Sequence, residues 1–164
     1  HALVEYALRL KDAGLGIEEI VERLEADKKR IRLIALLDTL EYLKKGGRIS
    51  KAAAMAGSLL SIKPVIAIQR GEVAILGKAR GSKQGNNLLA EQIRQTGGID
   101  FGKPFVLGYT GLSDAMLRKY IKDHESFWKS SVDALETSSV GGTIGTHIGP
   151  GAIGVAFFSA GDCI

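Results

Sequence analysis

Short aliphatic runs, each ended by glycine, proline or charged residues, constrain the fold of this chain more than any other feature of its sequence. Runs of this length are typical of buried β-strands, and the segments between them repeat apolar residues at helical spacing. We expect strands at 31–37, 64–69, 72–76, 105–110, 132–135 and 152–159. Because about six strands alternate with helices, we expect an α/β (α+β-like) domain of two layers, in which helices cover at least one face of a mixed sheet.

Turn and capping residues predict where several elements begin and end. Arg70-Gly71 lies between two of the expected strands and predicts a hairpin. Asp38, with Glu41 three residues later, predicts the start of a short helix that ends at Gly46. Ser50 is expected to begin the next helix.

The chain opens with two expected helices. In the second, Ile17, Ile20, Val21 and Leu24 follow the spacing of a buried stripe. The chain begins at His1 without a preceding Met, and its first residues read as helix with no capping residue in front. We therefore expect 1–27 to be a helical segment that continues from a missing N-terminal domain, and 28–164 to be one further domain.

Composition limits the setting in which the chain works. Apolar residues make up 45% of it, but no apolar run is long enough to cross a bilayer. No basic start followed by an apolar signal segment is present. The single cysteine, Cys163, cannot form an internal disulfide. These features predict a cytoplasmic protein without a membrane span.

Positive charge is concentrated in one stretch. Residues 44–83 hold nine basic residues and one acid, a balance of +8 in a chain of net charge +4, so the remainder is −4. Such a stretch attracts an acidic partner or an anionic ligand, although a solvated basic face would look the same. The stretch lacks interleaved aromatic residues, which argues against a nucleic-acid partner.

Three segments depart from the helix and strand pattern. Residues 46–51 combine two glycines with Arg48 and Lys51 ahead of an expected helix, which suits an anion or simply ends the preceding helix. Residues 78–83 place Lys78 and Arg80 between an expected strand and an expected helix, where a basic surface turn is the alternative. Residues 145–152 hold His147 between glycines, in a loop that allows a ligand to approach closely; a tight turn is the alternative.

Several catalytic patterns are missing from the sequence. Three scattered histidines and one terminal cysteine make no spaced metal-ligand set. Neither a glycine-rich phosphate loop ending in Lys-Ser/Thr nor a Gly-x-Ser-x-Gly elbow is present. The sequence therefore favours binding over catalysis, and no cofactor is expected.

Four motifs together resemble the DegV family in their order and spacing. They are LEYLKKGGRIS at 40–50, LLSIKP at 59–64, KARG at 78–81 and IGTHIGPGA at 144–152. The resemblance implies the C-terminal domain of a two-domain bacterial protein that binds one fatty acid between its domains. It also implies that the protein carries the acyl chain for a separate fatty acid kinase subunit, which forms an acyl phosphate for phospholipid synthesis.

The resemblance also implies roles for particular residues, and the pocket that we expect adds further residues to them. The carboxylate of a palmitate- or oleate-like fatty acid is expected at His147, Thr146, Gly145 and Arg48. Small residues around an adaptable methionine leave room for the acyl tail, predicted at Ala53, Met55, Ala56 and Leu60; a closely packed helix of small residues is the alternative. Basic residues expected to face the kinase are Lys51, Lys78 and Arg80. Two alternatives stay open: an enzyme domain acting on a phosphorylated small molecule, and a basic protein-interaction domain.

Overall fold

The computed structural model describes residues 1–50, 62–128 and 132–161. Six strands form one mixed sheet in the order β3-β2-β1-β6-β4-β5, in which the β4–β5 pair is parallel and the other neighbours are antiparallel. Its strands are β1 (Ile31–Leu36), β2 (Ile62–Gln69), β3 (Glu72–Arg80), β4 (Val106–Tyr109), β5 (Thr137–Ser139) and β6 (Ile153–Phe158). The expected mixed sheet of about six strands is thus confirmed.

The hairpin between β2 and β3 forms where the sequence predicts it. Arg70 has φ 53° and Gly71 has φ 84°, the left-handed pair that matches the twist of a two-residue hairpin. β3 continues to Arg80, four residues beyond the expected strand end, because it stays paired with β2 as far as Ile62.

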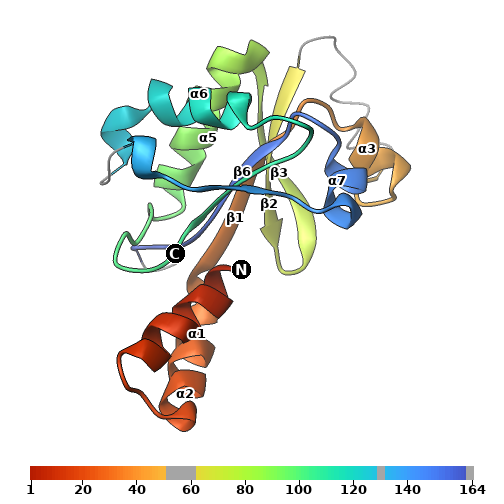
Figure 1. Cartoon of the computed structure of the whole chain (residues 1–164). Coiled ribbons are helices and arrows are strands. Elements are labelled where there is room, and N and C mark those ends of the chain that lie inside the picture. The colour runs from red at the N-terminus through yellow and green to blue at the C-terminus, as the bar shows by residue number, and fades with distance from the viewer. Residues whose placement is uncertain (51–61, 129–131, 162–164) are drawn as a thin grey trace.

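One face of the sheet is covered by two helices, α5 (Gly81–Gln95) and α6 (Ala115–Asp123) (Figure 1). We call this side the closed face. Apolar side chains of both helices pack there against alternate strand residues in the main core, which includes Ile34, Val65, Leu89, Ile93, Leu107, Leu117, Tyr120, Ile121, Val155 and Phe157. The stripe expected at Leu117, Tyr120 and Ile121 is confirmed, since all three are buried.

The opposite side, which we call the open face, is covered only near its two ends. At one end, which we call the upper end, α3 (Glu41–Lys45) and α7 (Gly142–Ile148) lie close together. There Leu43 and Ile148 pack against Ala35 and Ile66. At the lower end, α1 (Ala2–Asp12) packs through Tyr6 on strand residues that include Phe158. Between these ends the face lacks a covering helix among the residues that the structure describes.

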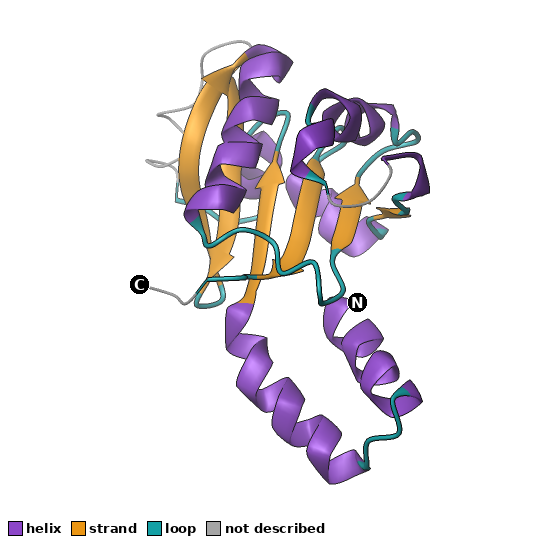
Figure 2. Ribbon diagram, turned by 90° about the vertical axis from the view of Figure 1, so that its left-hand side faces the viewer, coloured by secondary structure: helices purple, strands orange, loops and turns teal. Residues whose placement is uncertain are grey.

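Helices α1 and α2 (Ile17–Asp27) form an antiparallel pair, the arm, which extends beyond the end of the sheet (Figure 2). Its base is fastened by Lys103, whose Nζ lies 2.6 Å from Oδ2 of Asp27 and 2.8 Å from the hydroxyl of Tyr6. Burial alone would raise the pKa of Asp27. The hydrogen bonds from Lys103 and Tyr6 outweigh that effect and hold the pKa below its ordinary 3.8.

Three local predictions are wrong, the first because a tertiary ion pair competes with the local signal. Asp38 does not cap α3 but forms an ion pair with Lys63 on β2, and the hydroxyl of Thr39 accepts from the Glu41 N–H instead. Residues 132–134 form the 3₁₀ helix η3 rather than a strand, and the strand next to β4 is β5. His147 lies in the helix α7, not in a loop.

The predicted stripe of α2 is also partly wrong. Ile20 is buried, but Ile17 is 73% exposed and Val21 is 51% exposed, because α1 covers only one side of α2. The helix expected from Ser50 onward lies outside the described residues. The remaining 3₁₀ helices are η1 (Lys28–Arg30) and η2 (Glu125–Phe127).

Candidate functional site

The open face carries a pocket of about 400 Å³ whose floor follows from the strand register. Ala35 on β1, Gly154 on β6 and Gly108 on β4 are direct cross-strand neighbours and form one row of very small residues. The next row toward the arm consists of Leu33, Ala156 and Val106. Because side chains alternate between faces along a strand, these small residues hollow the open face without weakening the core behind it.

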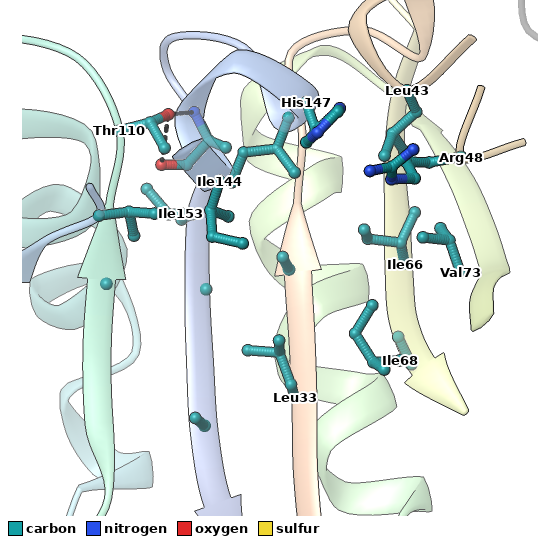
Figure 3. Close-up of a pocket in the computed structure, with 18 of the residues that line it drawn as sticks. Leu33, Leu43, Arg48, Ile66, Ile68, Val73, Thr110, Ile144, His147 and Ile153 are labelled. Atoms are coloured by element: carbon teal, nitrogen blue, oxygen red, sulfur yellow. Dashed lines mark hydrogen bonds between the residues drawn. The ribbon is translucent and has the colours of Figure 1, made fainter. Parts of the chain in front are cut away.

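The walls of the pocket are apolar, and they leave it open to solvent on one side. Leu33 is 41% exposed and Ile68 is 43% exposed, so large aliphatic side chains stand at the surface beside the floor. Ile144 of α7, 56% exposed, overhangs the upper part (Figure 3). The pocket is therefore a half-closed apolar groove rather than a sealed cavity.

Polar side chains meet the groove only at its upper end. Among the described residues that line it, Arg48, Thr110 and His147 alone carry polar side chains. Figure 3 places all three near α3 and α7, with Leu33 and Ile68 farther down the sheet. This lining suits a molecule with a long apolar part and one polar head.

The hydroxyl of Thr110 is already used within the protein. It donates to the carbonyl of Gly149 at 2.6 Å and accepts from the N–H of Ala152 at 2.9 Å. Thr110 thus holds the C-terminal end of α7 against β4, and it is 4% exposed. Sequence reasoning missed this residue, because its role depends on two partners about forty residues away in the chain.

Arg48 and His147 remain as the polar groups that a ligand could meet. The Arg48 guanidinium donates to the carbonyl of Gly46 at 2.9 Å through one nitrogen, which leaves further N–H groups for an anion. His147 comes from α7, and its Nδ1 is buried without a hydrogen-bond partner among the described residues. A guanidinium and an imidazole are groups with which a carboxylate or a phosphate can form hydrogen bonds and ion pairs.

The structure brings together only part of the residue set predicted from the sequence. Arg48 and His147 line the same pocket, whereas Gly145 and Thr146 are absent from its described lining. The hydroxyl of Thr146 donates to the carbonyl of Gly142 within α7. The predicted tail residues Ala53, Met55, Ala56 and Leu60, and also Lys51, lie outside the described residues.

The two remaining basic residues lie on β3, at the edge of the sheet. Lys78 is paired in register with Pro64, and Arg80 with Ile62, and neither lines the groove. The apolar floor itself was not predicted, although glycines inside two aliphatic strands, Gly108 and Gly154, were a usable signal. Glycine within a strand often marks the close approach of a ligand or of another backbone.

Metal-ligating side chains do not gather in the described part of the chain. No group of three or more histidine, cysteine, aspartate or glutamate side chains there could hold a metal ion. No helix in those same ranges is both long and apolar enough to cross a membrane.

Comparison with known proteins gives a consistent result. A family model described as "Uncharacterised protein, DegV family COG1307" matches residues 1–160. A DegV domain-containing protein of Caldanaerobacter subterraneus subsp. tengcongensis is 34% identical over 157 residues, covering 94% of this chain and 54% of that protein.

Two solved structures are similar along nearly the whole chain. The fatty acid kinase (Fak) B3 protein of Streptococcus pneumoniae, loaded with linoleic acid, is 25% identical with a TM-score of 0.82, covering 95% of this chain and 54% of that one. A stearic acid-binding protein of Eubacterium ventriosum is 26% identical with a TM-score of 0.76, covering 94% and 53%. The chain therefore spans about half the length of the proteins that it matches.

Proposed function

The chain belongs to the DegV family, as its motifs indicated, and from that premise we propose that it binds a long-chain fatty acid. The acyl tail lies along the floor made by Ala35, Gly108 and Gly154, and the carboxylate lies at the upper end beside Arg48 and His147. The observation that carries this proposal is the confinement of polar lining to one end of an otherwise apolar groove. Each methylene buried there contributes about 0.8 kcal/mol, so the tail dominates the binding energy.

Relatives with bound lipid support the same assignment. The linoleic acid of the pneumococcal protein and the stearic acid of the Eubacterium protein are both long-chain carboxylic acids. An aliphatic groove of about 400 Å³ is within the usual size range of small-molecule sites. Neither a metal nor an organic cofactor is needed for holding such a ligand.

We further propose that a second domain completes the site. The groove is open beside Leu33 and Ile68, and the matched relatives are about twice as long as this chain. An N-terminal domain, from which segment 1–27 continues, would cover the exposed side of the tail and add hydrogen-bond donors for the carboxylate. If half of about fifteen methylenes stay in water without it, the chain alone loses roughly 6 kcal/mol of binding free energy, or about four decades in affinity.

The bound carboxylate is presented, in this proposal, to a separate fatty acid kinase subunit that converts it to an acyl phosphate. The name of the pneumococcal neighbour motivates this step. The basic residues Lys51, Lys78 and Arg80 are proposed to face that subunit, because surface charge chiefly accelerates the encounter of two proteins. The protein itself then supplies the lipid and no catalytic group.

The first test is direct identification of a copurified lipid. The protein is purified at the length of its relatives, denatured and extracted, and the extract is analysed by mass spectrometry. We expect one equivalent of a long-chain fatty acid. An extract without acyl chains, together with no binding of added palmitate or oleate, contradicts the proposal.

The second test concerns the head group. His147→Ala is expected to weaken fatty-acid binding roughly ten- to hundred-fold, since a hydrogen bond to a charged group contributes about 1.5–3 kcal/mol. His124→Ala is the matched control, because His124 lies at the end of α6 and bonds to the carbonyl of Tyr120. Calorimetric titration with oleate below its micelle-forming concentration measures both. Equal affinities for the two variants would remove His147 from the site.

A further inference from the structure

The imidazole of His147 lies directly against Gly46, the C-cap residue of α3. A β-carbon built on Gly46 would overlap Nδ1 of His147 and lie 3.1 Å from Cε1 of the same ring. Real β-carbons almost never come so close to another heavy atom, so the ring occupies the space that a side chain at position 46 would need. Nδ1 faces that contact, and Nε2 is left as the ring nitrogen that a ligand can reach.

The backbone of Gly46 does not itself require glycine. Its φ of −77° and ψ of −1° are ordinary right-handed helical values, which alanine adopts readily. The residue that ends the helix in a left-handed conformation is Gly47, with φ 68°. There the N–H groups of Gly47 and Arg48 bond back to the carbonyls of Lys44 and Leu43, a glycine-dependent helix end. The need for glycine at position 46 therefore comes from the His147 ring beside it and not from the backbone conformation of Gly46.

Gly46 also contacts the second head-group residue. Its carbonyl accepts the hydrogen bond from the Arg48 guanidinium at 2.9 Å. A single residue thus touches the imidazole of His147 through its α-carbon side and the guanidinium of Arg48 through its oxygen. Displacement of Gly46 would move both groups relative to each other.

Helix α7 cannot simply retreat from Gly46 to make room for a side chain. Its C-terminal end, which carries His147, is held next to β4 because the buried hydroxyl of Thr110 donates to the carbonyl of Gly149. A β-carbon on Gly149 would in turn overlap the ring of Tyr42, which belongs to α3, the helix that Gly46 caps. Helices α3 and α7 therefore meet through two glycines, and the position of the His147 ring is fixed between them.

We propose that Gly46 is the positioning residue of the head-group site: its lack of a side chain lets His147 close against α3 with Nε2 toward the ligand, while its carbonyl orients Arg48. The proposal rests on the fatty-acid site described above for its functional consequence, but its structural part is independent of any ligand. It predicts that the effects of substitutions at positions 46 and 147 on stability are not additive. If Gly46 mattered only for packing within α3, the two effects would add.

The test is a double-mutant cycle read by stability as well as by binding. Gly46→Ala is expected to lower the melting temperature by about 2–12 °C, because overpacking costs about 1–3 kcal/mol in a domain of this size. In the His147→Ala background the same change is expected to cost much less, since the new methyl group occupies the space that the ring vacates. Gly142→Ala is the matched control: it adds the same methyl group to α7, where no heavy atom lies within 4 Å.

Two further readouts separate positioning from general packing. In nitrogen-correlated NMR spectra of the imidazoles without ligand, Gly46→Ala should shift the His147 signals and leave those of His124 in place. Oleate affinity should fall roughly ten- to hundred-fold with Gly46→Ala, yet should not fall further when Gly46→Ala is added to His147→Ala.

Each outcome has a definite meaning. Additive stability losses, or unmoved His147 signals in Gly46→Ala, would overturn the inference whatever the ligand. Absence of oleate binding to the unmodified protein would instead count against the proposed function, and the stability cycle and the spectra would still decide the role of Gly46.

Discussion

The two faces of the sheet are built from the same six strands, and yet one carries large buried side chains and the other carries small ones beside a groove. On the closed face, Val155 and Phe157 are fully buried under α5 and α6. One residue away along the same strand, Gly154 and Ala156 form the floor of the groove. Large and small residues thus alternate along β6 with the period of the strand itself.

This difference shows how a domain with a single sheet can have a packed core on one face and a groove on the other. The closed face supplies the packed core, and at its margin Phe105 stacks on Trp128 while Phe127 meets the same ring edge to face. The open face is covered by α3 and α7 at one end and by the arm at the other, and the small residues between them leave the groove. The packed core and the proposed binding site therefore lie on opposite sides of one layer, and substitutions should separate stability from binding.

The largest expected effect is a loss of stability on the closed face. Phe157→Ala should reduce the free energy of unfolding by about 3–5 kcal/mol, because the ring is fully buried and leaves a cavity. Leu33→Ala, on the neighbouring strand but 41% exposed on the open face, should cost less than about 1.5 kcal/mol. Urea unfolding at pH 7 measures both. Similar losses for the two variants would erase the distinction between the faces.

The next effect is a loss of binding on the open face. Ala156→Leu fills the floor and should displace two or three methylenes of the acyl tail, which lowers affinity about fifteenfold to sixtyfold at about 0.8 kcal/mol each. Its melting temperature should change little, because the new side chain projects into the groove. Ala160→Leu adds the same atoms at an exposed position outside the groove lining. Displacement of a fluorescent fatty acid compares the two, and unaltered affinity in Ala156→Leu would mean that the tail lies elsewhere.

A smaller effect concerns the arm that closes the lower end of the open face. The pKa of Asp27 is held below 3.8, so its carboxylate stabilises the fold above that pH, and this contribution is lost as the pH falls below 3.8. Asp27→Asn should cost about 1–3 kcal/mol at pH 7 and make stability less sensitive to acid. Urea midpoints at pH 7 and near pH 3 provide the comparison. An equally steep acid dependence in Asp27→Asn would assign that dependence to other carboxylates.

The smallest effect on stability is expected at the edge of the sheet. Reversing Lys78 and Arg80 to glutamate should change the free energy of unfolding by about 1 kcal/mol or less, since exposed charges contribute little. Association with the proposed kinase subunit should slow, most at low salt. Lys11→Glu with Lys122→Glu gives the same charge change on α1 and α6, away from β3. Equal slowing in both double variants would show that only net charge matters.

Much of the local structure could be predicted because its causes are local. The hairpin at Arg70-Gly71 and the end of α3, where Gly47 is left-handed, follow from glycine conformations and strand periodicity. The prediction failed where a distant partner decided the outcome. Asp38 was expected to cap α3, but it forms an ion pair with Lys63 of β2 instead. The strand expected at 132–135 failed for a related reason, since short apolar runs carry little information on whether they pair.

The head-group site was predicted only in part. Arg48 and His147 were singled out because glycines surround both, and they do line one pocket. The floor at Gly108 and Gly154 was missed, although glycine within a strand is a usable signal, because only the strand register places the two side by side. Thr110 was missed as well, since nothing near it in the chain indicates that it holds α7.

By itself, the sequence determined the family, the mixed sheet and the identity of the charged and imidazole groups, since motifs and side-chain periodicity are properties of the chain. Only the tertiary structure decided that small residues from β1, β4 and β6 meet in one row, and that α3 and α7 approach through Gly46 and Gly149. The physical reason is that strand register and helix contact join residues far apart in the chain. A groove depends on which side chains are absent at those meeting points, and the linear sequence does not show where the meeting points are.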